Sequence, residues 1–318
     1  MKSIVVYYSQ TGNTKKIAHA IHAGMKKAGQ PEDQCDIARL KDVTPKDMAN
    51  YDLIGLGSPI LSFREPANVS AFIDGMRSVD GKHAFAFNTH GALPAMYLQS
   101  VVPKMVQRGL TVVGWNDWYG SVVFPVIMKP YLTDGHPDAI DIEEAERFGT
   151  EMEERSRRIY QGETQLIPTF PKGKEYDEIY NPFPAEPSPE LGAYLKSQAF
   201  VFKVNKEKCK YPKCTHCIDN CPTGCIDFSS SPPNFNINFD DVRCIKCFLC
   251  EQTCPNGAIE VDYNEMTEKH DFAVNTIFIP SLDYQEKRGR FRRLVPLKDI
   301  DWDTRVWHKK HPRFKIDY

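Results

Sequence analysis

The sequence lacks any long apolar run. In 318 residues the clearest are "IVVYY" near the N-terminus and "SVVFPVIM" at residues 121–128, and neither approaches the roughly 18 residues that a membrane-spanning helix needs. A signal peptide is not indicated either, because the first apolar run is short and a polar hexapeptide follows it directly. We therefore expect a soluble, cytoplasmic chain with no membrane span.

An excess of charge of one sign is also absent. The chain has 40 Lys and Arg against 42 Asp and Glu, so no global charge favours nucleic acid or an anionic membrane. No G-x-G-x-x-G follows a predicted strand, which argues against direct reduction by a pyridine nucleotide. Neither a Ser/His/Asp set nor paired carboxylates stand in a context that suggests hydrolysis. Any reactive site must therefore be local.

Residues 1–165 alternate β-rich apolar runs with helical patterns, which is typical of parallel βαβ units in an α/β fold. The predicted strands are residues 3–8, 51–58, 83–88 and 110–115, with a weaker one near Cys35. Their near-continuous apolar character fits strands that are covered on both faces.

Apolar residues at helical spacing predict amphipathic helices over residues 17–28 and 142–159. We expect the second helix to begin at Asp141, with Glu144 reaching back to close a capping box. A further helix is expected before residue 108, and Pro103 should kink it because proline cannot donate a backbone hydrogen bond.

Six small polar residues join the first strand to the first helix; they are Ser9, Gln10, Thr11, Gly12, Asn13 and Thr14. Hydroxyls and backbone N–H groups at a helix N-terminus form a ready anion site. The stretch lacks the lysine of a P-loop, which a triphosphate would want, and the glycines of a dinucleotide turn. A monoester phosphate, neutralised by hydrogen bonds and the helix dipole, fits better.

The stretch "VVYYSQTGNTKKIAHAI" resembles the phosphate loop of the flavodoxin family at its apolar pair, its aromatic residue, Ser9, Gly12, Thr14, Ala18 and Ile21. The resemblance implies a doubly wound parallel sheet of order 2-1-3-4-5. It also implies that FMN lies at the carboxyl ends of the strands, with its phosphate on residues 9–14.

Two later loops would flank the flavin ring by the same resemblance. The first supplies Ser58, Pro59, Ile60, Leu61 and Phe63, and the second supplies Asn88, Thr89, His90, Gly91 and Leu93. Phe63, Leu93 and Tyr97 are either ring contacts or ordinary packing residues. His90 either donates a proton to a reduced flavin or a substrate, or only hydrogen-bonds its neighbourhood.

Nine of the ten cysteines fall between Cys209 and Cys254, after a proline-rich connector predicted over residues 166–200. Close cysteine spacing in a cytosolic chain indicates metal instead of disulfides. The run Cys244-x2-Cys247-x2-Cys250-x3-Cys254-Pro255 has the bacterial ferredoxin spacing, in which three thiolates surround one cluster and the fourth reaches another. Cys214, Cys217 and Cys221 repeat the pattern at an offset of 33 residues.

Residues 201–262 resemble two-cluster ferredoxins, which implies a second, smaller α+β ferredoxin-like domain with two [4Fe–4S] clusters. By the crossed ligation of that family, the first cluster takes Cys209, Cys214, Cys217 and Cys254, and the second takes Cys244, Cys247, Cys250 and Cys221. The first run departs from the family, because Tyr211 stands at the repeat's cysteine position and Cys209 lies two residues upstream.

Cys225 is left over from the eight ligands. The repeat aligns it with Ala258, so we interpret it as a packing residue. A zinc site made of two C-x2-C pairs is the main alternative for this region. Zinc leaves at least four of the repeated cysteines and both Cys-Pro pairs unexplained.

Residues 263–318 are expected to form a C-terminal extension that wraps the domains and buries Phe278, Trp302 and Trp307. Its basic stretch, residues 285–298, suggests a solvated surface, a nucleic-acid contact of a redox-sensing regulator, or a surface that steers an acidic redox partner. The near-neutral chain weakens the nucleic-acid alternative, so we expect no nucleic-acid partner.

Most of the chain resembles flavodoxin and ferredoxin fusions of anaerobic bacteria and archaea. This implies an electron-transfer iron–sulfur flavoprotein, an oxidoreductase or electron carrier, in which FMN and two clusters exchange electrons with a redox partner protein. The alternative is an FMN-dependent reductase of a small organic substrate, fed by the clusters, with a pocket lined by Phe63, His90, Tyr97 and Trp118. Homodimerisation is left open.

Overall fold

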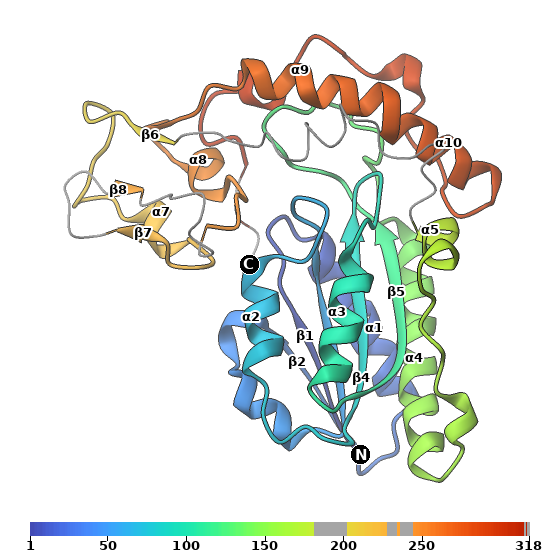
Figure 1. The fold of residues 1–318 in the computed structure, drawn as a ribbon. Helices are drawn as coiled ribbons and strands as arrows, with labels where there is room; N and C mark the ends of the chain where they lie inside the picture. The colour runs from blue at the N-terminus through green and yellow to red at the C-terminus, as the bar shows by residue number, and fades with distance from the viewer. Residues whose placement is uncertain (181–201, 228–233, 236–243, 315, 317–318) are drawn as a thin grey trace. The chain divides into compact units, whose positions relative to one another are not determined.

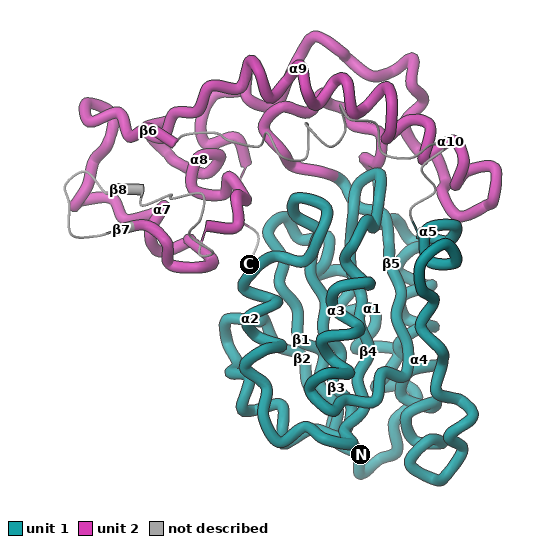
Figure 2. Tube along the Cα trace, in the orientation of Figure 1, with its two compact units in different colours: residues 1–121, 135–182 teal, residues 122–134, 183–318 magenta. Residues whose placement is uncertain are grey.

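The computed structural model describes residues 1–180, 202–227, 234–235, 244–314 and 316. These residues divide into two compact units (Figure 2). The first unit comprises residues 1–121 and 135–180, and the second comprises residues 122–134 and the described residues after 201. Most of the predicted proline connector lies outside the described residues. The domain boundaries predicted from the sequence stay a prediction.

A five-stranded parallel sheet forms the centre of the first unit (Figure 1). Its strands are β1 (Lys2–Tyr7), β2 (Gln34–Arg39), β3 (Leu53–Pro59), β4 (His83–His90) and β5 (Thr111–Tyr119). They lie in the order β2-β1-β3-β4-β5. All eight positions of β4 are buried, as expected for a central strand covered on both faces. The predicted doubly wound sheet of order 2-1-3-4-5 is confirmed.

Helices cover both faces of the sheet (Figure 1). The helices of this unit are α1 (Asn13–Ala28), α2 (Ala67–Gly75), α3 (Tyr97–Gln107), α4 (Ala139–Tyr160) and α5 (Lys174–Tyr180). Short 3₁₀ turns lie at Leu40–Asp42, Pro45–Asn50 and Thr164–Leu166. One apolar cluster joins the sheet to α1 and α4, and another joins it to α2, α3 and α5. This two-layer burial holds the carboxyl ends of the strands, where the loops of the candidate site begin.

The start of α4 differs from the sequence prediction. The N-cap is Asp138, whose side chain accepts hydrogen bonds from the N–H groups of Ile140 and Asp141, and Asp141 is the third helical residue that closes the capping box. The predicted cap at Asp141 is therefore wrong by three residues, because Asp138 offers the same carboxylate one turn earlier. Pro103 does lie inside α3.

The second unit consists of short elements. Its helices are α7 (His216–Asp219), α8 (Leu249–Thr253), α9 (Asn264–Ala273) and α10 (Ile279–Lys287), with a π-helical turn at Val274–Phe278. Two antiparallel pairs of two-residue strands accompany them, β6 (Lys203–Val204) with β9 (Ile259–Glu260) and β7 (Ile226–Asp227) with β8 (Asn234–Phe235). Further 3₁₀ turns lie at Leu297–Asp299 and Val306–His308. None of the described helices of the chain is both long and apolar enough to cross a membrane.

Residues 122–134 leave the first unit between β5 and α4 and belong to the core of the second. Val126 is fully buried, and the ring of Phe124 meets Phe248 edge-on at a centroid distance of 5.1 Å. The N–H groups of Val306 and Trp307 donate to backbone carbonyls of the segment over 2.9 and 2.8 Å. The segment thereby fastens the C-terminal extension inside the second unit.

Burial within the C-terminal extension is also different from the prediction. Phe278, Trp302 and Trp307 are only half-buried. The buried apolar residues among the described part of the extension are Tyr263, Ala273, Val274, Ile277, Leu282, Phe291, Ile300 and Val306. Hydrophobicity alone did not distinguish these sets, since large aromatic residues keep an edge in solvent when they cover a small core.

Candidate functional site

The six-residue stretch 9–14 forms the turn from β1 into α1, as predicted. Gly12 is the N-cap of α1 with a φ of 90°, a left-handed conformation that glycine adopts without steric cost. No side chain caps this helix and no acidic residue lies in its first turn. The positive end of the helix dipole is therefore left for an anion from outside the helix.

Asn13 and Thr14 tie this turn to two other chain segments at the same edge of the sheet. The Asn13 side-chain amide donates to the Ser121 carbonyl over 2.7 Å. The hydroxyls of Thr14 and Thr89 are hydrogen-bonded at 2.7 Å. The turn of residues 9–14 and the predicted loop that contains Thr89 therefore lie together, as expected from the sequence.

The loops after β3 and β4 are joined to each other by backbone hydrogen bonds. The N–H of Ile60 donates to the Thr89 carbonyl over 3.1 Å, and the N–H of Met96 donates to the Phe63 carbonyl over 3.0 Å. Ser62, Phe63 and Ala95 have positive φ angles of 51°, 66° and 45°. Left-handed backbone at residues other than glycine is sparse in proteins and concentrates at functional loops.

Asn88, at the carboxyl end of β4, is the most informative side chain of this edge. It is completely buried, and neither its amide nitrogen nor its amide oxygen has a hydrogen-bond partner among the described residues. An unpaired buried amide costs a few kcal/mol, so its retention points to a ligand that supplies a donor and an acceptor. Sequence reasoning assigned Asn88 to this site by position, but could not show that its side chain lacks a partner.

Three expected contacts of a bound ring or substrate are part of the protein core. Tyr97 is completely buried, and its hydroxyl accepts a hydrogen bond from Ser58 over 3.3 Å. Trp118 packs edge-on against Phe148 at 5.6 Å. Leu93 is buried as well, whereas Phe63 stays half-exposed. The burial of Tyr97 and Leu93 therefore supports the packing interpretation of these two residues, and Trp118, expected to line a substrate pocket, packs in the core.

His90 is held at both ring nitrogens. Nδ1 lies 3.0 Å from the Gly91 carbonyl oxygen, and Nε2 lies 2.9 Å from Oδ2 of Asp117. Both contacts lie within hydrogen-bond distance and fix the orientation of the ring. The ring of Tyr119 packs against the imidazole at 4.6 Å. His90 thus hydrogen-bonds its neighbourhood, which is one of the two interpretations left open by the sequence.

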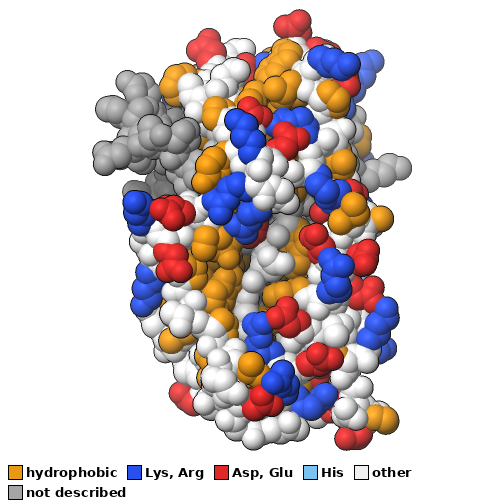
Figure 3. Space-filling model, turned by 90° about the vertical axis from the view of Figure 1, so that its right-hand side faces the viewer, with side chains coloured by type: hydrophobic (Ala, Val, Ile, Leu, Met, Phe, Trp, Pro, Cys, Tyr) orange, Lys and Arg blue, Asp and Glu red, His pale blue; other side chains and the backbone are white. Residues whose placement is uncertain are grey.

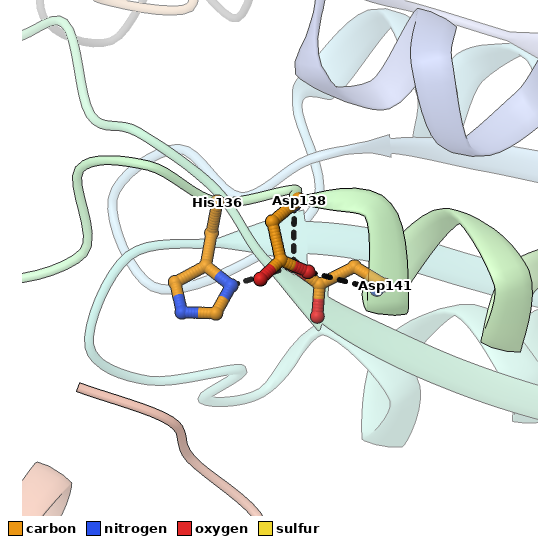
Figure 4. Close-up of side chains that lie close together, drawn as sticks. All are labelled: His136, Asp138 and Asp141. Carbon is orange, nitrogen blue, oxygen red and sulfur yellow. Dashed lines mark hydrogen bonds and ion pairs between the residues drawn. The ribbon is translucent and has the colours of Figure 1, made fainter. Parts of the chain in front are cut away.

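His136, Asp138 and Asp141 gather at the start of α4 (Figure 4). One possible ligand atom from each lies within 4.8 Å of the others. Nδ1 of His136 is 2.6 Å from Oδ2 of Asp141, and that oxygen also accepts from the Asp138 N–H over 2.8 Å. The carboxylates are therefore engaged in capping the helix, which accounts for the cluster without an ion. Sequence reasoning did not single out this group.

In the second unit, four cysteines line one pocket. They are Cys209, Cys214, Cys217 and Cys254, and Pro255 and Ile259 lie beside them. This is the set that the sequence analysis assigned to the first cluster, including the thiol that crosses over from the second run. The longer C-x4-C spacing after Cys209 does not keep that residue from the pocket.

The other five cysteines of the repeat region form a second group, made of Cys221, Cys225, Cys244, Cys247 and Cys250. Sγ of Cys221 lies 3.5 Å from Sγ of Cys225, and Cys225 also hydrogen-bonds the thiol of Cys244. Cys250 and Cys225 belong to the same small apolar cluster as Ile218 and Ile226. Cys225, interpreted as a packing residue, thus lies among the four thiols of the second predicted ligand set.

Burial governs the protonation of these thiols. Desolvation raises the pKa of Cys217 to about 12 and that of Cys247 to about 12, and it raises the pKa of Cys250 well above its ordinary value. Metals bind the thiolate and not the thiol. A metal that enters these groups must therefore displace protons, and its apparent affinity rises with pH. Grouped thiolates suit zinc or an iron–sulfur cluster.

Two arginines of the C-terminal extension are paired with carboxylates of their own unit. Arg305 makes a two-pronged contact with Asp271 at 2.9 and 2.7 Å, and Arg293 contacts Asp283 and Glu286. On the face shown in Figure 3, Lys and Arg are interspersed with Asp and Glu. This arrangement weakens the nucleic-acid interpretation, which needs a continuous basic surface.

Residues 4–111 match the family model of the flavodoxin domain. The chain is 30% identical over 152 residues to the uncharacterized protein MJ0298 of Methanocaldococcus jannaschii. This alignment covers 46% of this chain and 95% of that protein. It is 27% identical over 150 residues to an NAD(P)H dehydrogenase (quinone) of Rhodopseudomonas palustris, covering 38% of this chain and 73% of that protein. A flavodoxin of Megasphaera elsdenii is 29% identical over 113 residues, covering 35% of this chain and 80% of that protein.

Proposed function

This chain belongs to the flavodoxin-like proteins through its N-terminal domain, and from that premise we propose that its first unit binds FMN at the carboxyl edge of the sheet. The observation that carries the proposal is Asn88, a buried amide with no partner, in the loop set that holds residues 9–14. FMN, when bound, supplies redox chemistry that takes up electrons singly or in pairs.

The residues of this edge have separable tasks in the proposal. The turn 9–14 and the N-terminus of α1 hold the phosphate by backbone N–H groups, hydroxyls and the helix dipole. Asn13 and Thr14 fix that turn through Ser121 and Thr89. The Asn88 amide offers one donor and one acceptor to the polar edge of the ring. The half-exposed Phe63 covers an apolar part of it.

We further propose that the second unit carries two [4Fe–4S] clusters. The first pocket presents four cysteine side chains, which is the number that one cluster requires. The other group contains the four remaining predicted ligands and Cys225. In the first pocket, Cys254 from the second cysteine run lies beside Cys209 from the first run. This crossed set and the second group of thiols together support two clusters over a single zinc ion, because one zinc ion uses only four thiolates.

The primary function is therefore electron transfer between FMN, the two clusters and a redox partner protein. Ten free cysteines suit a reducing compartment, so we place the protein in the cytoplasm. A second candidate is the reduction of a small quinone-like substrate at the flavin, which the similarity to an NAD(P)H dehydrogenase (quinone) favours. The burial of Tyr97 and Trp118 removes two of the four side chains expected to line its substrate pocket. Homodimerisation stays a prediction.

The decisive experiment is an anaerobic analysis of iron, sulfide, zinc and flavin, with visible and electron paramagnetic resonance spectra during stepwise reduction. We expect about eight irons and about one FMN per chain. Zinc in place of iron, or a purified chain that takes up no FMN, contradicts the proposal. Rapid reoxidation of the reduced protein by a quinone, with none by any partner protein, favours the reductase instead.

Asn88 gives a sharper test of the flavin site. Asn88→Ala should weaken FMN binding about tenfold, because one hydrogen bond in a closed site is worth about 1.4 kcal/mol. Asn50→Ala is the matched control, since Asn50 is an exposed amide of the same unit. Equal FMN affinity of both variants would show that Asn88 does not meet the flavin.

A further inference from the structure

The two cysteine groups of the second unit differ by one thiol. The first pocket has four cysteines, and the second group has five, because Cys225 lies among the predicted ligands. Sγ of Cys225 is 3.5 Å from Sγ of Cys221, whereas no second cysteine follows Cys254 in the matching half of the repeat. Four ligands complete one cluster, so the fifth thiol requires a separate account.

The internal repeat supplies a control for this difference. In the second half, the N–H of Ala258 donates to Sγ of Cys254 over 3.3 Å. In the first half, the N–H of Cys225 donates to Sγ of Cys221 over 3.4 Å. The backbone contact is the same in both halves, and only the side chain changes from a methyl group to a thiol. Packing needs are met by alanine, so the thiol adds chemistry that the other half lacks.

We propose that Cys221 and Cys225 form a reversible disulfide that protects the second cluster site when it loses its iron in the presence of hydrogen peroxide. The proposal rests on the iron–sulfur assignment above and deepens it. Cys221 is partly exposed and Cys225 is buried. This is the arrangement of an attacking thiol with a resolving thiol behind it.

The step balances with hydrogen peroxide as the oxidant. The sulfur of Cys221 attacks one peroxide oxygen, the O–O bond breaks, and a sulfenic acid and one water form. The sulfur of Cys225 then displaces the hydroxyl group as a second water, so two S–H bonds are replaced by one S–S bond. The two sulfurs must approach from 3.5 Å to the usual bond length of about 2.0 Å. A dithiol reductant restores both thiols for reloading.

The first pocket has no such resolving thiol. Ala258 occupies the position that corresponds to Cys225, so oxidation of Cys254 can continue to the irreversible sulfinic and sulfonic acids. The proposal therefore predicts that the two cluster sites of one chain differ in their recovery from peroxide.

The test starts from the iron-loaded protein, and the number of iron atoms per chain is measured first. The protein is treated with a chelator and then with hydrogen peroxide, and its peptides are mapped by mass spectrometry after alkylation. The variants are Cys225→Ala, which gives the first half of the repeat the residue of the second, and Ala258→Cys, which does the reverse. After a dithiol, ferrous iron and sulfide are supplied and the iron is counted again.

We expect a Cys221–Cys225 cross-link in the wild type that the dithiol reverses, and an additional link from Cys254 to the introduced thiol in Ala258→Cys. The wild type should regain about half of its iron, in the second group only. The Cys225→Ala variant should load normally at first and should regain little iron, because neither group then has a resolving thiol. A link between Cys225 and Cys244, or equal irreversible oxidation of Cys221 in the wild type and in Cys225→Ala, overturns the proposal. Zinc or no metal at the first count contradicts the iron–sulfur assignment instead, and the peptide map still decides the disulfide.

Discussion

The two units of this chain differ in the side chains that fill their interiors. The first unit encloses a five-stranded sheet between helix layers, with large apolar clusters on both faces. Among its described residues, the second unit has strands of only two residues, and two of its apolar clusters contain cysteines. We therefore expect the first unit to fold on apolar burial alone, and the second to depend on the clusters proposed for its thiols.

Metal removal should separate the units most strongly. Structural metal binding by thiolates contributes on the order of 10 kcal/mol to folding, so removal of iron by a chelator under anaerobic conditions should abolish protection in the second unit. Hydrogen exchange with mass spectrometry measures both units in one sample. Amides of β4 should stay protected and those of α8 should exchange. If the amides of β4 lose protection, or if those of α8 exchange no faster after iron is removed, the expected difference between the two units is contradicted.

A core truncation should affect only the first unit. Phe85 is fully buried, and its ring fills the space over Gly55, where an added Cβ would lie 2.2 Å from it. Phe85→Ala should lower the unfolding free energy of this unit by about 3–5 kcal/mol through the cavity it leaves. Phe272→Ala, at a residue that is 44% exposed, is the control and should cost less than about 0.5 kcal/mol. Urea unfolding gives the values, and the iron content of Phe85→Ala should remain at the wild-type level.

The contact between α1 and α4 should tolerate no side chain at Gly149. A Cβ there would lie 2.0 Å from the Ile21 carbonyl oxygen, so Gly149→Ala must push two backbones apart and should cost about 3 kcal/mol. At Gly29 the nearest atoms would be 3.5 Å away, and Gly29→Ala should be neutral or slightly stabilising. Equal thermal stability of the two variants would show that the helices are not held this closely.

Acid should weaken the first unit through His83. Burial lowers the pKa of His83 to about 4 from its ordinary 6.5, and Nδ1 is hydrogen-bonded to Ser156 at 2.8 Å. Because the folded state prefers the neutral ring, the associated stability is present above pH 6.5 and is lost as the pH falls toward 4. The loss should be about 3 kcal/mol. In His83→Gln this part of the slope of unfolding free energy against pH should disappear, and an identical slope in both proteins excludes His83 as its source.

Much of the first unit was predictable because its signals are local. The apolar runs that form β1, β3, β4 and β5 alternate with helical spacing, and the turn 9–14 has its full pattern within six residues. The start of α4 was misplaced, because Asp138 and Asp141 both offer a capping carboxylate. Tyr97 and Trp118 could not be assigned from the sequence, since an aromatic residue after a strand can face either a ligand or a helix layer.

The sequence by itself determined the order of strands and helices, the anion-binding turn and the two cysteine runs, because each depends on residues that are close along the chain. Only the tertiary structure decided that Asn88 is buried without a partner. The tertiary structure also placed the thiol of Cys225 against that of Cys221, and it placed residues 122–134 in the second unit. These features depend on which distant segments pack together, and packing is decided by the free energy of the whole fold and not by local pattern.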